Sequence, residues 1–139
     1  MSSSDSASGK ASQKIFSDRY YRKNAEKIKA DIKNWKLRNP IQVYRQRVKQ
    51  RAKQQSLDFN LDLDWFREKL SHGHCEVTYL PFIQSDKRMA PFAASVDRTD
   101  PHKGYTKDNC KMVIWCYNAA KGDNSHDEVM IMARALCSS

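Results

Sequence analysis

The sequence predicts a mixed α+β protein, with basic helices in its first half and a small unit of two strands and a helix in its second half. Three observations support this prediction. The 139 residues suit one compact domain with an appended helical arm. Residues 10–53 hold 15 Lys or Arg and 3 acids, a net charge of +12, and the remaining residues sum to −3. From Cys75 onward, short runs of β-forming residues between turn residues replace the helical periodicity.

The N-terminal part is expected to be a tail followed by a long helix. Residues 1–13 are rich in serine and lack an apolar run, so we expect a disordered tail and no secretory signal. Ser17 can cap a helix over residues 18–37, and Asn39 ends it because the residue before a proline avoids the α region. Apolar residues of this helix recur at helical spacing on one face: Ile28, Ile32 and Trp35.

Two further helices are expected before the β-rich part. Pro40 is well placed to begin a helix that runs to about residue 55. Its apolar stripe lies beside a series of basic residues and consists of Val43, Tyr44, Val48 and Ala52. After a short loop, either Asp62 or Asp64 can cap a third helix over residues 65–70.

The second half contains the predicted strands. Residues 75–83, CEVTYLPFI, fit a short edge strand or a hairpin arm because they combine β-formers with a proline. Residues 92–96 predict a strand that ends at Asp97, and residues 110–115 predict a second one. Asp-Pro, Lys-Gly and Asp-Asn pairs between them are typical of a loop. Residues 116–121 then begin a helix.

A last helix is predicted over residues 127–136, with Ser125 as its cap. The chain is therefore expected to have three parts. They are a tail (residues 1–13), a basic helical arm whose excess positive charge favours a polyanion such as nucleic acid (residues 14–70), and a strand-containing core with the C-terminal helix (residues 71–139).

Asp97 and Asn118 are the candidate site residues. In a strand–loop–strand–helix unit, the end of the first strand and the start of the helix can lie side by side, so these side chains would converge. Carboxylate and amide oxygens suit Mg²⁺ or Mn²⁺, which can polarise a phosphate. Arg98 would add a fixed cation for the phosphate. Spacing alone leaves open structural roles, with Asp97 capping the loop, Asn118 capping the helix and Tyr105 in the core.

The stretch SVDRTDPHKGYTKDNCKMVIWCYNAAKG, residues 95–122, resembles the ββα-metal (His-Me finger) motif of the HNH endonuclease superfamily. The similarity is to the small phage and restriction-type branch, with the pattern S-x-D-R-x-D-x-x-x-G-Y-x-x-x-N, an apolar strand, then N-x-x-K. The preceding CEVTYLPF resembles the C-x-V-T-G-x-P-F arm of phage members. The matching residues of the motif are Ser95, Asp97, Arg98, Asp100, Gly104, Tyr105, Asn109, Asn118 and Lys121.

The resemblance implies roles for these residues. Asp97 and Asn118 would be the metal ligands, and Asn109 would hold the loop between the strands. Most family members have a histidine after the metal-binding aspartate as general base, whereas this chain has Arg98, which cannot accept a proton near neutral pH. A nearby tyrosine takes part in the Asp-Arg branch, so Tyr105 is the first candidate for the base. His102 is the second candidate.

The implied function is a metal-dependent DNA endonuclease that uses Mg²⁺ or Mn²⁺, one ion per active site. It would nick double-stranded DNA as a monomer and cut both strands if it forms a homodimer. The basic helices would supply phosphate contacts, which position the DNA but do not read its sequence. The candidate DNA-binding residues are Lys27, Lys33, Arg45, Arg47, Arg51 and, in the motif itself, Lys121.

Further features of the sequence concern membrane insertion, the cysteines and the alternative functions. No run approaches the ~18 apolar residues of a membrane span. The four cysteines form no CxxC pair, so we expect free thiols in a reducing cytoplasm, that of a bacterial host if the gene is of phage origin, and no structural zinc. Two alternatives remain open: a DNA-binding or regulatory protein that kept this scaffold but lost its base, and an RNA-binding protein.

Overall fold

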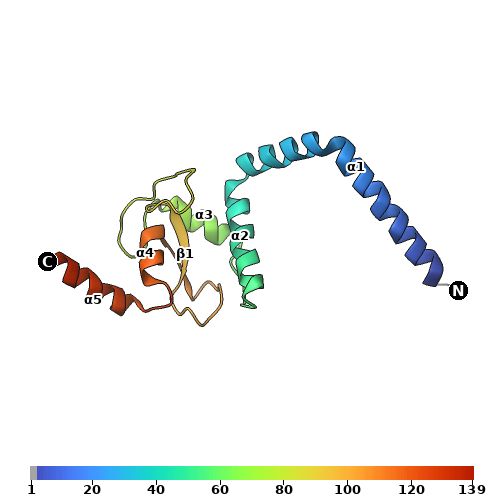
Figure 1. Ribbon diagram of the computed structural model, residues 1–139. Helices are drawn as coiled ribbons and strands as arrows, with labels where there is room; N and C mark the ends of the chain where they lie inside the picture. Colours follow the sequence, from blue (N-terminus) through green and yellow to red (C-terminus); the bar gives the residue numbers. More distant parts are fainter. Residues whose placement is uncertain (1–2) are drawn as a thin grey trace. The chain divides into compact units, whose positions relative to one another are not determined.

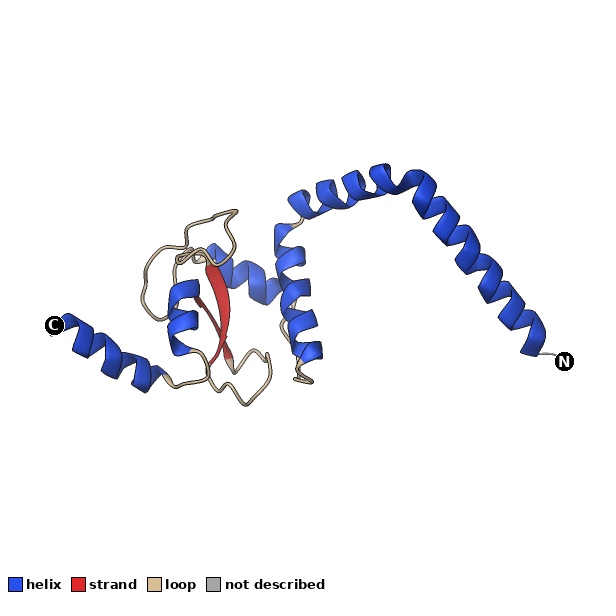
Figure 2. Cartoon of the chain, in the orientation of Figure 1, coloured by secondary structure: helices blue, strands red, loops and turns tan. Residues whose placement is uncertain are grey.

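The computed structural model describes the backbone of residues 3–139 and the side chains of residues 18–139. Within these residues the protein has five helices and one antiparallel sheet of two strands, which confirms the predicted mixed α+β class (Figures 1 and 2). The chain divides into two compact units, Met1–Pro40 and Ile41–Ser139.

The first unit is formed by helix α1, Ser3–Arg38, which bends at Asn24 (φ −114°, ψ 16°), as Figure 1 shows. The helix starts within the segment expected to be a disordered tail, and residues 1–2 lie outside the described residues. Ser17 is therefore inside the helix and is not its cap. No proline interrupts residues 3–38, and the Ala, Gln and Lys residues there favour helix.

The apolar residues of α1 do not form the buried face that their spacing suggested. Ile32 and Trp35 are each 48% exposed, and Leu37 is 71% exposed. Ile32, Trp35 and Leu37 thus lie at the surface of the helix, among its exposed lysines.

The second unit has its core between two helices and one face of the sheet. Helix α2 (Pro40–Gln54) contributes Val48 and Ala52, and helix α3 (Leu63–Ser71) contributes Trp65 and Phe66 to the same buried cluster as Met112. The structure thus divides the chain after Pro40, whereas the sequence suggested residue 70, because the apolar stripe of α2 packs in this core. Asp62 caps α3 by accepting a hydrogen bond from the backbone N–H of Trp65.

The sheet pairs β1 (Ala94–Arg98) with β2 (Cys110–Ile114), and helix α4 (Trp115–Lys121) follows directly. Both strands and α4 lie within about two residues of their predicted positions. In the register, Asp97 lies opposite Lys111, and Arg98 lies opposite Cys110. Successive side chains of a strand point to opposite faces. One face, with Val96 and Cys110, packs on the core of α2 and α3, and the other carries α4.

Two further segments complete the unit. The expected strand at residues 75–83 is absent from the described structure and is replaced by turns, with one isolated bridge between His74 and Pro81. Tyr79 has a positive φ of 61°, which a regular strand does not allow. Helix α5 (His126–Cys137) has Ser125 as its N-cap in a capping box with Glu128, so the predicted cap is confirmed.

Candidate active site

The alternation of side chains along β1 directs Asp97 and Arg98, which are neighbours in the sequence, to opposite faces of the sheet. Asp97 shares its face with Ser95 and, across the register, with Lys111. Arg98 faces the other side, opposite the buried Cys110. The face of Asp97 therefore carries the candidate site, and the face of Arg98 belongs to the core.

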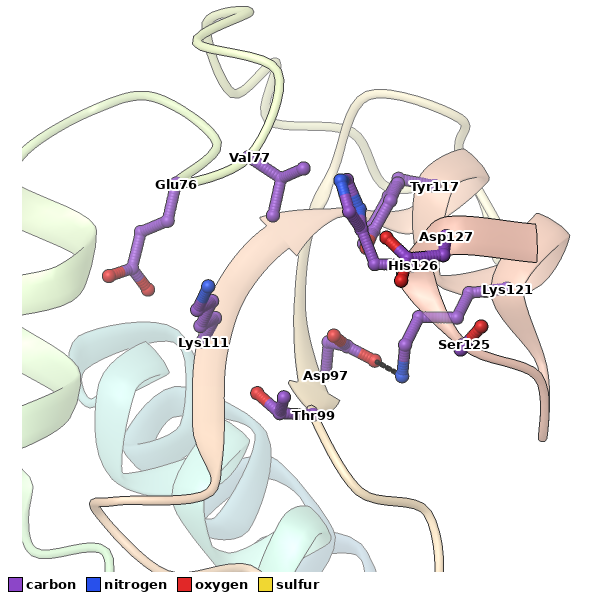
Figure 3. Close-up of a pocket in the computed structure, with 10 residues that line it drawn as sticks. All are labelled: Glu76, Val77, Asp97, Thr99, Lys111, Tyr117, Lys121, Ser125, His126 and Asp127. Atoms are coloured by element: carbon purple, nitrogen blue, oxygen red, sulfur yellow. Dashed lines mark hydrogen bonds and ion pairs between the residues drawn. The ribbon is translucent and has the colours of Figure 1, made fainter. Parts of the chain in front are cut away.

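Asp97 is buried, with 4% of its surface exposed, and it forms an ion pair with Lys121 of α4. The Lys121 ammonium lies 3.0 Å from Oδ1 of Asp97 (Figure 3). It also donates a hydrogen bond of 2.7 Å to the Arg98 carbonyl. Lys121 is only 1% exposed, so it does not reach the surface to bind DNA as the sequence suggested. Its charge neutralises Asp97 in a place where an unpaired carboxylate would be costly.

Asn118 ties α4 to β1 on the same face. Its amide nitrogen donates to the Ser95 hydroxyl (2.8 Å) and to the Val96 carbonyl (3.0 Å). The Val96 carbonyl can only accept, which assigns the nitrogen of Asn118 to this contact, and the amide oxygen accepts no hydrogen bond from the described residues. Asn118 thus fixes the helix against the strand directly before Asp97.

A pocket of about 330 Å³ opens beside Asp97. Since a water molecule occupies about 30 Å³, the pocket has room for a phosphodiester group and several waters. Its polar walls come from the segment before the sheet, both strands, α4 and the start of α5 (Figure 3). The lining residues that can carry charge or transfer a proton are Glu76, Asp97, Lys111, Tyr117, Lys121, His126 and Asp127.

Tyr117 and His126 form a linked pair in this pocket. The Tyr117 hydroxyl lies 3.0 Å from Nδ1 of His126, and both side chains line the same space as Asp97 (Figure 3). Burial, and then the negative charge of Asp97, raise the pKa of Tyr117 to about 12. Tyr117 therefore keeps its proton at neutral pH and serves as a neutral hydrogen-bonding partner for the imidazole.

Asn109 holds the loop between the strands. Its side-chain oxygen accepts from the Asp100 N–H (2.9 Å), and its nitrogen donates to the carbonyls of Asp100 (3.1 Å) and Gly104 (2.9 Å). Gly104 passes so close to Asp58 that a Cβ there would lie 2.6 Å from the Asp58 carbonyl oxygen. This close approach requires glycine at the position.

Arg98 and Tyr105 do not occupy the positions that their expected roles require. The Arg98 guanidinium donates to the carbonyls of Pro101 (2.8 Å) and Lys103 (3.0 Å) and lies 4.9 Å from the centre of the Tyr105 ring. Tyr105 is 4% exposed in the core cluster. Neither residue lines the pocket of Asp97. Side-chain alternation in β1 turns Arg98 to the core face, where it holds the loop, and Tyr105 of that loop packs in the core cluster.

His102, the second candidate base, is also remote from the pocket lining. It is exposed in the loop, where its backbone N–H donates to the Asp100 carboxylate (2.9 Å). His126 was missed because its proximity to Asp97 depends on the turn between α4 and α5. Lys111 was missed too, although the strand register alone could have placed it opposite Asp97.

The basic residues of the helices differ in availability. Lys27 and Lys33 are exposed on α1, and Arg47 and Arg51 are exposed on α2. Arg45 is instead used inside the protein, because it donates to the Leu61 carbonyl (2.8 Å) and covers the Phe59 ring. A hollow on α2 is lined by Lys49 and Lys53, which were not among the candidate DNA-binding residues.

Whether a metal ion fits the Asp97 pocket depends on the protein atoms that could coordinate it. Among the described residues, no group of three or more His, Cys, Asp and Glu side chains could hold one. Two oxygens accept no hydrogen bond from the described residues: Oδ2 of Asp97, which lines the pocket, and Oδ1 of Asn118, whose side chain lies on the same face of the sheet. Mg²⁺ keeps several waters and is usually bound by one or two protein oxygens together with substrate phosphate. The site fits such an ion, with Asp97 as the pocket-lining ligand.

The chain is similar in sequence to a phage protein. It is 33% identical over 79 residues to an uncharacterized 29.0 kDa protein of Enterobacteria phage T4, encoded in the dda-modA intergenic region. The match covers 57% of this chain and 31% of the phage protein, so the chain spans about a third of that relative. No family model and no solved structure matches the chain. Among the described residues, no helix is long and apolar enough to cross a membrane.

Proposed function

We propose that this chain is a metal-dependent DNA endonuclease with a ββα-metal core of the HNH type. One observation carries the proposal. Asp97 and Asn118 lie 21 positions apart in the sequence, yet β1 and α4 hold them on one face of the sheet, where Asp97 lines a pocket together with Lys111 and His126. An oxygen donor, cations and an imidazole in one pocket are the groups that hydrolysis of a phosphodiester needs.

In this proposal each residue of the pocket has a task. Asp97 and Asn118 would hold Mg²⁺ or Mn²⁺, which supplies charge neutralisation at the phosphate when bound. Lys111 lies across the register from Asp97 and is exposed, so its ammonium is available to a non-bridging phosphate oxygen. Lys121 orients the Asp97 carboxylate through their ion pair. Asn109 sets the shape of the loop through its three hydrogen bonds.

The exposed lysines and arginines of α1 and α2 supply sequence-independent affinity in this proposal. Phosphate contacts of this kind release counterions, so binding should weaken steeply with salt. With one site in each chain, a monomer nicks one strand, and cleavage of both strands takes two sites or two events. The relationship to a phage protein is consistent with action in the cytoplasm of a bacterial cell.

A plasmid-nicking assay tests the proposal. Purified chain and supercoiled plasmid are incubated with Mg²⁺, with Mn²⁺ or with EDTA, and the relaxed form is measured. We expect nicking with either metal and none with EDTA. Asp97→Asn should abolish it, and Asp86→Asn, the same change at an exposed loop position, should not. Nicking that persists in Asp97→Asn would contradict the proposed site.

The second candidate function is DNA binding without cleavage. It is favoured by the Asp97–Lys121 ion pair, because Lys121 already supplies the positive charge that a divalent ion would bring. This alternative predicts salt-dependent binding of duplex DNA that is the same with Mg²⁺ and with EDTA, and no nicking under either condition. Tighter binding of RNA than of duplex DNA would point to an RNA-binding protein instead.

A further inference from the structure

We propose that His126, oriented by Tyr117, accepts the proton of the attacking water in the Asp97 pocket. The inference rests on the proposed endonuclease function and names its missing base. It replaces Tyr105 and His102, whose side chains do not line the pocket.

The geometry leaves one nitrogen of His126 for this task. Nδ1 is engaged by the Tyr117 hydroxyl at 3.0 Å, so Nε2 is the ring nitrogen available to a water in the pocket. In the tautomer with the proton on Nδ1, His126 donates to the Tyr117 oxygen and presents the lone pair of Nε2. A general base held by a second polar group has the arrangement that efficient proton transfer requires.

Tyr117 suits the orienting role because its position is fixed. It is buried at 8% exposure in the cluster that also holds Cys75, Val113 and Ile114. Its oxygen can accept from Nδ1 while its own proton remains in place.

The other titratable groups around the pocket are less suitable at neutral pH. Carboxylates ordinarily titrate near 4 and ammonium groups near 10, whereas an imidazole ordinarily titrates near 6.5. Glu76 is moreover bonded to Lys69 and to the Met112 N–H, and Asp97 is paired with Lys121. The other titratable groups that line the pocket with His126 are Glu76, Asp97, Lys111, Tyr117, Lys121 and Asp127.

In the proposed step, one water hydrolyses one phosphodiester bond. A water oxygen forms a bond to phosphorus as one water proton passes to Nε2 of His126. The bond between phosphorus and the leaving sugar oxygen breaks, and that oxygen takes a proton from solvent. His126 then releases its proton to solvent, so one water and one phosphodiester give a phosphomonoester and a hydroxyl.

Cleavage kinetics provide the first test. His126→Ala should lower the cleavage rate by ~10²–10⁴-fold with little change in DNA affinity. Added imidazole should restore part of the rate, and the acidic limb of the wild-type pH–rate profile should be absent from the variant without imidazole. His72→Ala, the loss of an exposed histidine outside the pocket, is the matched control and should keep the wild-type rate. Full activity of His126→Ala, or a loss confined to His102→Ala, would overturn the inference while leaving the endonuclease function intact.

The tautomer of His126 provides a second test that needs no cleavage. Nitrogen NMR of the full chain should show the neutral ring protonated at Nδ1, and Tyr117→Phe should shift the ring toward protonation at Nε2. A wild-type ring protonated at Nε2 overturns the inference whether or not the chain cleaves DNA. A wild-type chain that cleaves no nucleic acid in either metal overturns the proposed function, and the role of His126 with it.

Discussion

The two faces of the β1–β2 sheet use their charged side chains in opposite ways. On the core face, Arg98 is bonded to two loop carbonyls and covers the ring of Tyr105. On the α4 face, the charges of Asp97, Lys111 and Lys121 surround a pocket. Adjacent residues in the chain, Asp97 and Arg98, thus belong to different environments, because a strand turns each successive side chain to the other face.

The comparison shows which polar groups are available to a substrate. The hydrogen bonds of Arg98 all end on the protein's own carbonyls or on Gln55, so this side chain is already used in holding the loop. Asp97 has only one of its oxygens bonded to another described residue. Variants on the two faces should therefore differ in their effects on cleavage and on stability.

Asp97 should show the largest effect. Asp97→Ala is expected to lower cleavage by more than ~10³-fold, about 4 kcal/mol of transition-state stabilisation, because the pocket loses its carboxylate. The same change leaves the buried Lys121 ammonium without its partner, which should lower the free energy of unfolding by about 3–5 kcal/mol. Nicking rates and urea denaturation of the same variant measure the two effects.

A double variant separates chemistry from stability. Asp97→Leu with Lys121→Met removes the ion pair as a unit, so most of the lost stability should return while cleavage stays absent. If the double variant is stable and cleaves at the wild-type rate, Asp97 has no part in the reaction.

At Arg98 we expect a large effect on stability and a small effect on the cleavage rate. Arg98→Lys keeps the positive charge but loses the planar fork that reaches two carbonyls and the ring of Tyr105. We expect a loss of about 2–3 kcal/mol in the free energy of unfolding, from charged hydrogen bonds and the cation–π contact. The cleavage rate of the folded protein should change by less than about threefold. A large loss of cleavage at unchanged stability would place Arg98 at the substrate instead.

The sequence predicted the second unit well where local rules apply. Ser125 and Asp62 cap helices as their spacing suggested, and both strands and α4 follow from β-propensity and turn pairs. The segment 75–83 was predicted incorrectly, because its β-forming residues occur in tight turns with Tyr79 at positive φ.

The site was harder to predict because its members meet through tertiary packing. Asp97 and Asn118 could be paired from the order of elements, and Asn109 from the motif. Lys121 was assigned to DNA, since the sequence does not show that its side chain turns inward to Asp97. His126 depends on how the start of α5 returns to the pocket, which no local pattern encodes.

Alkaline pH should weaken both sides of the sheet. Burial raises the pKa of Tyr44, on the core side, to about 12, and that of Tyr117, in the pocket, also to about 12. Between the ordinary value near 10 and 12, the unfolded chain loses these protons and the folded chain keeps them, so the free energy of unfolding falls as pH rises. Each group contributes about 1.4 kcal/mol per pH unit in that window, and its contribution is fully present below pH 10.

Tyr44→Phe checks the contribution of the core side. Its hydroxyl accepts from the Val96 N–H (3.0 Å), so the variant should be less stable at pH 8. Between pH 10 and 12, however, its stability should decline less steeply than that of the wild type in urea titrations. Equal slopes for the two proteins would show that Tyr44 ionises as it does in the unfolded chain.

Lys111 should give the smallest effect and the sharpest test of which face meets the nucleic acid. Its ammonium is exposed, and its position opposite Asp97 directs it toward the pocket. Lys111→Gln should reduce the log–log salt slope of duplex binding by about 0.9, the value for one lost phosphate contact, and weaken affinity several-fold at moderate salt. Lys87→Gln, at an exposed position of the loop before β1, is the matched control for net charge. Fluorescence anisotropy over a salt series measures both variants. Equal salt slopes for Lys111→Gln and Lys87→Gln would mean that Lys111 contributes only to the net charge of the protein. In that case the α4 face would make no phosphate contact through Lys111.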